Sequence, residues 1–113
     1  MPSNRKLGKP TDQRMAMLRG LVADLLNYGQ IKTTVTRAKE VQPLAEKMIT
    51  LAKDNTLASY RQALAFIPQE DVAKKLFDQI GPKYADRTGG YTRVVRIGFR
   101  RGDAAEIAYL ELV

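Results

Sequence analysis

The chain contains no cysteine and no histidine in its 113 residues. Without cysteine it has no disulfide framework, no thiolate nucleophile and no cysteine-based zinc cluster. Without histidine it lacks the most frequent general base and the most frequent transition-metal ligand. These absences predict a protein with no metal site and no cofactor, and they disfavour an enzyme.

An enzyme that used lysine, tyrosine or carboxylate side chains stays open on composition alone, but the motifs do not support one. Glu70 and Asp71 are the only adjacent acidic pair, and the start of a helix explains both, because consecutive helical residues face apart. Gly89 and Gly90 belong to neither GxGxxG nor GxxxxGK[ST], so they form no recognised phosphate-binding loop.

Long apolar segments and membrane anchors are also missing. No apolar run approaches the roughly 18 residues that a membrane span requires, and residues 1–10 hold no signal-type hydrophobic stretch. The chain has no tryptophan, and no basic amphipathic helix with bulky apolar anchors is evident. We therefore expect a soluble, cytoplasmic protein without membrane contact, folded as one domain over residues 1–113.

Positive charge is in excess and is concentrated in two parts of the chain. There are 19 Lys and Arg against 12 Asp and Glu, which gives a net charge of +7 and an isoelectric point near 9.9. Residues 1–19 carry a net +4 and residues 81–103 another +4, whereas residues 20–80 carry +1 and the tail from Ala104 carries −2. Clustered positive charge favours a polyanionic partner, most often a nucleic acid.

Apolar periodicity predicts helices over most of the chain before the second basic cluster. A β-branched segment interrupts them and is typical of a strand. Pro43 lies inside the second helical pattern, so we expect a kink or a later start there. We expect a flexible basic arm at 1–10, then a helix capped by Thr11 and ended by Gly29, and then a strand from Ile31 to Thr36. A second helix, capped by Thr36, reaches the Asp54-Asn55 loop.

Two further helices are expected before the second basic cluster. The third helix starts at Thr56 and has Leu57, Tyr60, Leu64 and Ile67 on its apolar face. The fourth runs from Glu70 to a stop at Gly81-Pro82.

The end of the chain alternates with the period of a strand. Val95, Ile97 and Phe99 are expected to face the core, which leaves Arg96 and Arg100 on the opposite face. These two arginines lie four residues apart, roughly 13 Å along a strand, which is close to two phosphate spacings.

Gly102-Asp103 is predicted to be a two-residue hairpin turn before a second strand from Ala104 to Val113. The RGD sequence is therefore interpreted as a turn and not as an adhesion ligand. Together the elements predict an α+β fold of two layers, with a small mixed sheet and helices on one face. Their order is helix, strand, three helices and two antiparallel strands, after the basic N-terminal arm.

RNA is the polyanion that these features favour. Arginine guanidinium groups match phosphate oxygens and also stack on exposed bases. No helix carries the run of basic and amide side chains expected of a DNA major-groove reader. The candidate RNA-binding residues are Arg5, Lys6, Lys9, Arg14, Arg19, Lys32, Thr34, Arg87, Gly89, Gly90, Tyr91, Arg93, Arg96, Arg100 and Arg101.

Four of these candidates have an equally ordinary structural explanation. Tyr91 is a candidate for stacking on a base, but a tyrosine at the start of a strand is at least as often a packing residue. Gly89 and Gly90 permit close approach of a sugar–phosphate chain, or simply form a loop. Thr34 can bind a phosphate, or be present for its strand propensity.

The opening segment NRKLGKPTDQRMAMLRGLVADLL (Asn4 to Leu26) resembles the start of the bacterial large-subunit ribosomal protein family numbered seventeen. The matching positions there are Arg5, Lys6, Leu7, Gly8 and Lys9, then Arg14, Ala16, Met17 and Arg19. The resemblance continues through IKTTVTRAKEV (31–41), KMITLAK (47–53), KLFDQIGPKYADRTGGYTRVVR (75–96) and RRGDAAEIAYLELV (100–113). The sequence departs from the family pattern at Asn4, Gln13, Gly20 and Pro43.

This resemblance implies a structural and assembly protein of the large ribosomal subunit with no catalytic activity. Such a protein binds large-subunit rRNA, sits near the rim of the nascent-peptide exit, contacts small neighbouring ribosomal proteins, and is present as a monomer within the ribosome. We expect the basic N-terminal arm and the basic C-terminal hairpin to bind the rRNA. A free nucleic-acid chaperone or regulatory RNA-binding protein is the alternative.

Overall fold

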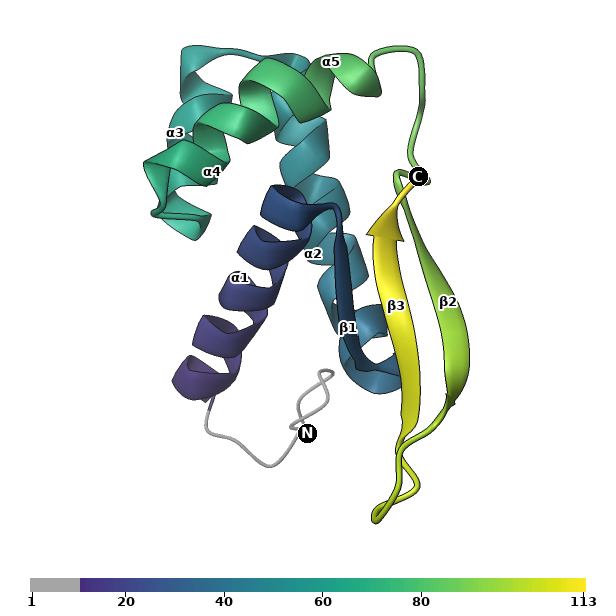
Figure 1. The fold of residues 1–113 in the computed structure, drawn as a ribbon. Coiled ribbons are helices and arrows are strands. Elements are labelled where there is room, and N and C mark those ends of the chain that lie inside the picture. The colour runs from purple at the N-terminus through teal and green to yellow at the C-terminus, as the bar shows by residue number, and fades with distance from the viewer. Residues whose placement is uncertain (1–10) are drawn as a thin grey trace.

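The computed structural model describes residues 11–113. The arm at 1–10, with the candidates Arg5, Lys6 and Lys9, lies outside the described residues. Helices and strands follow the predicted order, and the α+β fold is confirmed (Figure 1). The elements are α1 (Thr11–Tyr28), β1 (Gln30–Thr34), α2 (Val35–Asp54), α3 (Leu57–Phe66), α4 (Glu70–Lys75), the π-helical turn η1 (Leu76–Ile80), α5 (Gly81–Lys83), β2 (Thr92–Phe99) and β3 (Glu106–Leu112).

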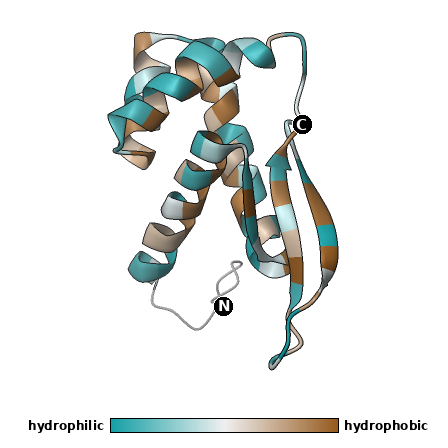
Figure 2. Cartoon of the chain, in the orientation of Figure 1, coloured by the Kyte–Doolittle hydropathy of each residue, from teal (hydrophilic) through white to brown (hydrophobic). Residues whose placement is uncertain are grey.

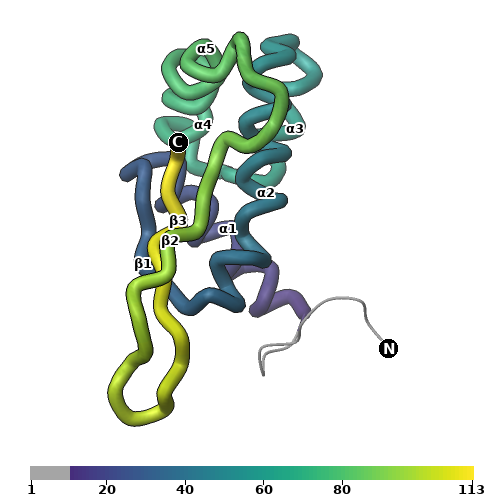
Figure 3. The backbone as a smooth tube through the Cα atoms, turned by 90° about the vertical axis from the view of Figure 1, so that its right-hand side faces the viewer, coloured from purple at the N-terminus to yellow at the C-terminus, as the bar shows by residue number. Residues whose placement is uncertain are grey.

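The three strands form one sheet in the order β1-β3-β2. Both neighbours of β3 run antiparallel to it, so the sheet is antiparallel in the described chain and not mixed as predicted. Ala108 and Leu110 of the central strand are fully buried, and both α1 and α2 contact β3. The helices thus cover one face of the sheet, and the β2–β3 hairpin extends past them (Figures 1 and 3).

The turn from β1 into α2 comes earlier than the sequence pattern indicates. Thr34, and not Thr36, is the N-cap of α2: its backbone is extended and its hydroxyl accepts a hydrogen bond from the N–H of Arg37 at 3.3 Å. The helix then runs without a break to Asp54, with Pro43 inside it, so a late start at Pro43 is wrong.

Helix α3 begins where predicted, at a capping box. The Thr56 hydroxyl accepts from the N–H of Ser59, and the Ser59 hydroxyl accepts from the N–H of Thr56, which satisfies two helix-end donors. Ser59 is buried, whereas Leu57, expected on the apolar face, is exposed. Leu57 is the first residue of the helix, and the buried side follows Ser59 and Ala63 instead.

The segment expected to stop at Gly81-Pro82 continues as helix to Lys83 (Figure 1). Gly81 has ordinary helical angles, φ −54° and ψ −53°, and its N–H bonds to the Leu76 carbonyl across the wide π turn. Pro82 has no N–H, and its ring would clash with a carbonyl of a regular α turn, so the widened turn accommodates it. Gly81 also lies against the backbone of α2, because a Cβ there would be 2.9 Å from the Ala52 oxygen.

This close approach predicts that Gly81→Ala destabilises the protein. Alanine normally favours a helix by about 1 kcal/mol over glycine, but overpacking against rigid backbone costs about 1–3 kcal/mol, so the sign reverses. Gly20→Ala is the matched control, since Gly20 lies inside α1 and a Cβ added there would meet nothing within 4 Å. Urea unfolding should show a loss for Gly81→Ala and a gain for Gly20→Ala; equal gains would contradict the contact.

The facing of β2 differs from the prediction. Val94 pairs with buried Leu110 and packs against the core, whereas Val95, Ile97 and Phe99 are exposed. Because Val94 and Val95 are adjacent, the apolar alternation of the strand could place either of them on the core side. Pairing with β3 places Val94 there, and not Val95 as predicted. A bulge between Arg96 and Gly98 then shifts the register, and the strand end lies beyond the helices. Figure 2 shows hydrophobic residues along β2 on this uncovered part of the hairpin.

The hairpin loop is also longer than two residues. Arg100 and Ala105 close it, with the Arg100 N–H donating to the Ala105 carbonyl at 2.7 Å. Gly102 and Ala104 both take positive φ, +93° and +57°. The RGD segment is therefore a turn, as predicted, but within a four-residue loop from Arg101 to Ala104.

Candidate nucleic-acid interface

Four arginines, the hairpin arginines, gather on β2 and its loop: Arg93, Arg96, Arg100 and Arg101. All four are exposed. Three of them pair with carboxylates: Arg93 with Glu111 at 2.7 Å, Arg96 with Glu106 at 3.4 Å, and Arg100 with Asp103 at 2.5 Å. Arg101 makes no ion pair with any residue of the described chain.

These pairs show how the acidic tail sits beside the second basic cluster. Antiparallel pairing places Glu111 opposite Arg93, and it places Glu106 diagonal to Arg96. The hairpin therefore carries four arginines against three carboxylates, and its excess charge is smaller than the sequence blocks indicate. Exposed ion pairs contribute only about 0–1 kcal/mol, so a phosphate can displace the carboxylate from these guanidinium groups.

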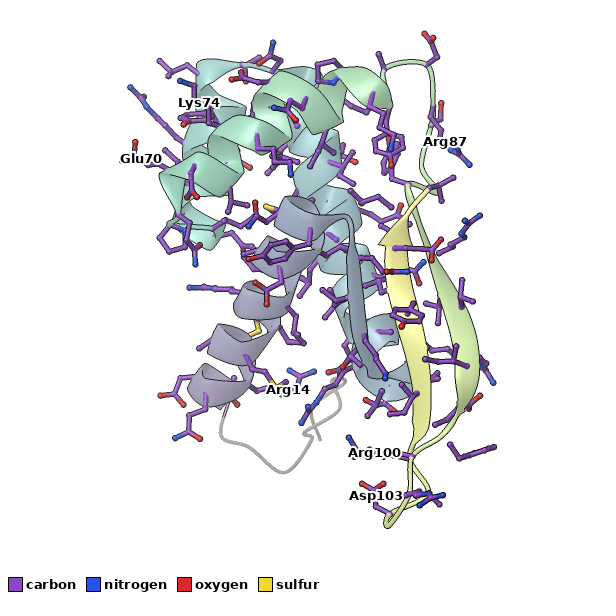
Figure 4. The ribbon with its side chains drawn as sticks, in the orientation of Figure 1. Arg14, Glu70, Lys74, Arg87, Arg100 and Asp103 are labelled. Atoms are coloured by element: carbon purple, nitrogen blue, oxygen red, sulfur yellow. The ribbon has the colours of Figure 1, made fainter. Side chains whose placement is uncertain are left out.

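Arg100 and Asp103 of the hairpin loop point toward each other at its tip (Figure 4). The Arg100 Nε and Nη2 donate to the two oxygens of Asp103, and the Ala105 N–H donates to Asp103 as well. The hydrogen bond from Arg100, then that from the Ala105 backbone, lowers the pKa of Asp103 from 3.8 to about 2. Arg93 acts in the same direction on Glu111 and lowers its pKa.

Asp103 is therefore expected to titrate near pH 2 in the folded protein. Because this pKa lies below the unfolded value of 3.8, the ionised carboxylate favours the folded loop above the unfolded pKa, and the contribution is lost as the pH falls through about 2. In Arg100→Gln the carboxyl loses its main partner, and the midpoint should rise toward 3.8. Side-chain carboxyl NMR measures both; an unperturbed midpoint in the unmodified protein would show that the contact is absent in solution.

Four further candidates lie outside the hairpin. Lys32 lies on β1 opposite Tyr109, on the sheet face away from the helices, and forms no ion pair in the described chain. Arg87 is exposed in the loop before β2. Arg19 lies on α1, where its guanidinium sits 5.3 Å from the centre of the Phe66 ring, and so belongs to a helical surface. The Thr34 hydroxyl caps α2, which explains this residue without a phosphate.

Arg14 is placed differently from the other candidate arginines. Its side chain is 7% exposed and forms an ion pair with Glu40, itself 8% exposed, at 2.5 Å. Arg14 thus joins α1 to α2 inside the protein and does not present its guanidinium to a ligand, so we remove it from the candidate set. The sequence indicates this burial through the helical periodicity of α1, because Arg14 lies four residues before Leu18 and therefore on the same face.

Tyr91 and the glycines before it also have structural roles. Tyr91 is 3% exposed, with its ring 5.3 Å from that of Tyr84, so it is not available to stack on a base. Its hydroxyl accepts from Lys53 at 2.9 Å, and this hydrogen bond lowers the pKa of Tyr91. Gly89 and Gly90 have φ of +80° and +64°, and the Gly90 N–H donates to Glu46, so this segment is a turn held onto α2.

Sequence reasoning missed a groove at the outer end of the sheet. We call it the distal groove. It is lined by Lys32, Thr33, Ile97, Gly98, Phe99, Arg100 and Ile107. Phe99 is 75% exposed there, although it was predicted to be in the core. Gly98, at φ +140°, marks the bulge and was the available signal, because a glycine inside a strand often indicates one.

Metal-binding clusters and membrane-spanning helices are both absent from the described residues. No group of three or more His, Cys, Asp or Glu side chains within 11–113 is arranged to hold a metal ion. No helix in this range has the length and apolar character needed to cross a membrane.

Comparison with known proteins agrees with the resemblance seen in the sequence. The family model for Ribosomal protein L17 matches residues 17–113. The large ribosomal subunit protein bL17 of Clostridium tetani is 64% identical over 113 residues, which cover all of both chains. The bL17 proteins of Clostridium acetobutylicum and Clostridium perfringens are 63% identical over 109 residues (96% of each chain) and 62% identical over 113 residues (all of each chain). The predicted family is confirmed, and the chain belongs to the ribosomal protein L17 family.

Proposed function

We propose that this chain is a structural constituent of the large ribosomal subunit that binds and stabilises large-subunit rRNA, without catalysis. Its relatives carry the name of a large ribosomal subunit protein over their full length at 62–64% identity. The whole of 1–113 acts as one rRNA-binding domain in this proposal, with the basic arm at 1–10 and the β2–β3 hairpin as its contact regions.

The observation that carries the RNA proposal is the position of the hairpin. It extends past the helix layer (Figures 1 and 3) with its arginines exposed and with apolar side chains uncovered. Val95, Ile97 and Phe99 are all exposed on this short segment. A partner that supplies both phosphates and base faces satisfies such a mixed surface, because arginine and aromatic groups recognise both.

The refined contact set keeps the candidate cations that are exposed in the described residues, and it retains the three candidate cations of the arm. These are Arg19, Lys32, Arg87, Arg93, Arg96, Arg100 and Arg101, together with Arg5, Lys6 and Lys9 of the arm. The family resemblance further supports a position near the rim of the nascent-peptide exit, in contact with small neighbouring ribosomal proteins. The chain acts there as a monomer within a cytoplasmic ribosome.

Binding to large-subunit rRNA is therefore expected to weaken steeply with salt. About five phosphate contacts give a log–log slope near −4, which corresponds to a loss of roughly 10²–10³-fold in affinity between about 50 and 200 mM salt. Fluorescence anisotropy of labelled rRNA fragments, titrated with the full chain, measures this slope. A slope near zero would contradict recognition through phosphates.

A further inference from the structure

We propose that the distal groove binds one unpaired RNA nucleotide, with Phe99 stacked on its base and with Lys32 and Arg100 against its flanking phosphates. This inference rests on the proposed function and deepens it, because it assigns base contact to a residue that the sequence pattern places in the core. It replaces Tyr91, whose ring is buried against Tyr84, as the stacking residue.

The groove offers an apolar floor with an aromatic ring at its edge. Ile97, Gly98 and Ile107 line it beside Phe99. Gly98 pairs with Ile107, and because glycine has no side chain the sheet is hollow there. Phe99 leaves 75% of its surface in solvent, so burial in the protein accounts for little of its presence at this position. A base stacked on this ring removes from water the apolar surface that the fold leaves exposed.

The charges around the groove match a nucleotide. Its two charged lining residues, Lys32 and Arg100, are both cations, and no carboxylate lines it. Lys32 has no ion-pair partner within residues 11–113. Arg100 uses Nε and Nη2 to hold Asp103, while its Nη1 makes no hydrogen bond in the described chain. One lysine and one guanidinium nitrogen are thus available for phosphate oxygens on either side of a stacked base.

These charges also favour RNA over a protein partner. An apolar protein segment in the groove would cover Phe99 but would also desolvate Lys32 and Arg100. Unless that segment carried an acidic group, this desolvation would cost free energy. A nucleotide supplies a flat π face and negative charge in one unit. The nucleotide must be unpaired, because a base inside a duplex is already stacked on both sides.

The test uses the absence of tryptophan from the chain. Phe99→Trp gives a protein with a single tryptophan at the groove, and its emission reports stacking directly. Tyr28→Trp is the matched control: Tyr28 is 74% exposed, against 75% for Phe99, and it lies at the end of α1 outside the groove. The probes are large-subunit rRNA transcribed in vitro and a blunt-ended RNA duplex, with binding followed separately by anisotropy.

The expected result is strong quenching of Phe99→Trp by the rRNA, little change for Tyr28→Trp, and no quenching by the duplex. Binding of the rRNA without quenching of Phe99→Trp would overturn the stacking proposal alone. Equal quenching by duplex and rRNA would overturn the requirement for an unpaired base. A blue-shifted emission with large-subunit proteins freed of rRNA, and none with rRNA, would assign the groove to a protein. No binding of rRNA by the unmodified chain would overturn the proposed function and the groove together.

A second variant tests the energetic share of the ring. Phe99→Ala is expected to weaken rRNA binding about 10-fold or more, whereas Phe99→Trp retains the affinity. The thermal midpoint of Phe99→Ala should match that of the unmodified chain, because the ring is mostly exposed. Unchanged rRNA affinity in Phe99→Ala, with the fold intact, would contradict the assignment.

Discussion

Replacing either Arg14 or Glu40 alone by methionine is expected to lower the free energy of unfolding by about 3–5 kcal/mol. Arg14 on α1 and Glu40 on α2 form an ion pair with side chains only 7% and 8% exposed. Removal of one partner leaves the other as an uncompensated charge between two helices. The large loss of stability comes from the buried charge that is left unpaired. It exceeds the net free energy that the ion pair contributes to folding.

The double variant separates these two quantities. The pair is joined by one hydrogen bond, and the Arg14 Nε and Glu40 Oε2 are buried without a partner in the described residues. Because the pair is only partly satisfied, two methionines of similar volume should recover most of the stability lost by either one. Urea unfolding followed by circular dichroism measures all three variants. Single variants as stable as the unmodified chain would contradict the buried position of Arg14.

Removal of charge from the hairpin is expected to weaken rRNA binding by about 10²–10³-fold at about 0.1 M salt. The variant replaces Arg93, Arg96 and Arg101 by glutamine and keeps Arg100, which holds the loop through Asp103. Three lost phosphate contacts make the log–log salt slope less negative by roughly 2–3, which corresponds to that loss in affinity. All three residues are exposed, so the unfolding free energy should change little.

A control variant with the same net charge distinguishes the hairpin from general attraction. Lys47, Arg61 and Lys74 are exposed on α2, α3 and α4, and their replacement by glutamine also removes three charges. Lys74 lies on the helical side of the molecule, away from the hairpin (Figure 4). This variant with glutamine at Lys47, Arg61 and Lys74, the helical variant, should keep most of the affinity for rRNA and most of the salt slope. Equal losses in the two variants would show that overall charge, and not the hairpin, determines binding.

The order of elements could be predicted from the sequence because it depends on local patterns. Each of these patterns is short-range: the apolar stripe of α1 repeats every three or four residues, and the capping residue Thr56 directly precedes α3. The continuation of helix through Gly81 could not be predicted in this way. It involves the wide π turn of η1, which accommodates Pro82, and the close approach of Gly81 to Ala52 of another helix.

The candidate site was harder to predict because its properties depend on strand pairing. The Val94-Val95 doublet allows two phases, and only the partner strand β3 decides which valine faces the helices. Charge counted along the chain separates the basic cluster from the acidic tail, whereas the hairpin brings Glu106 and Glu111 beside the arginines. Exposure of individual cations is similarly a property of the fold, as the buried Arg14 shows.

Sedimentation of the tagged chain with bacterial ribosomal particles tests whether the chain is a constituent of the large subunit. We expect the chain to travel with the large subunit at about one copy per particle and to stay bound when the subunits are separated. The variant with glutamine at Arg93, Arg96 and Arg101 should be incorporated less well, while the variant with glutamine at Lys47, Arg61 and Lys74 should be incorporated normally. A folded chain that stays at the top of the gradient, or that binds small subunits equally, would contradict a role in the large subunit.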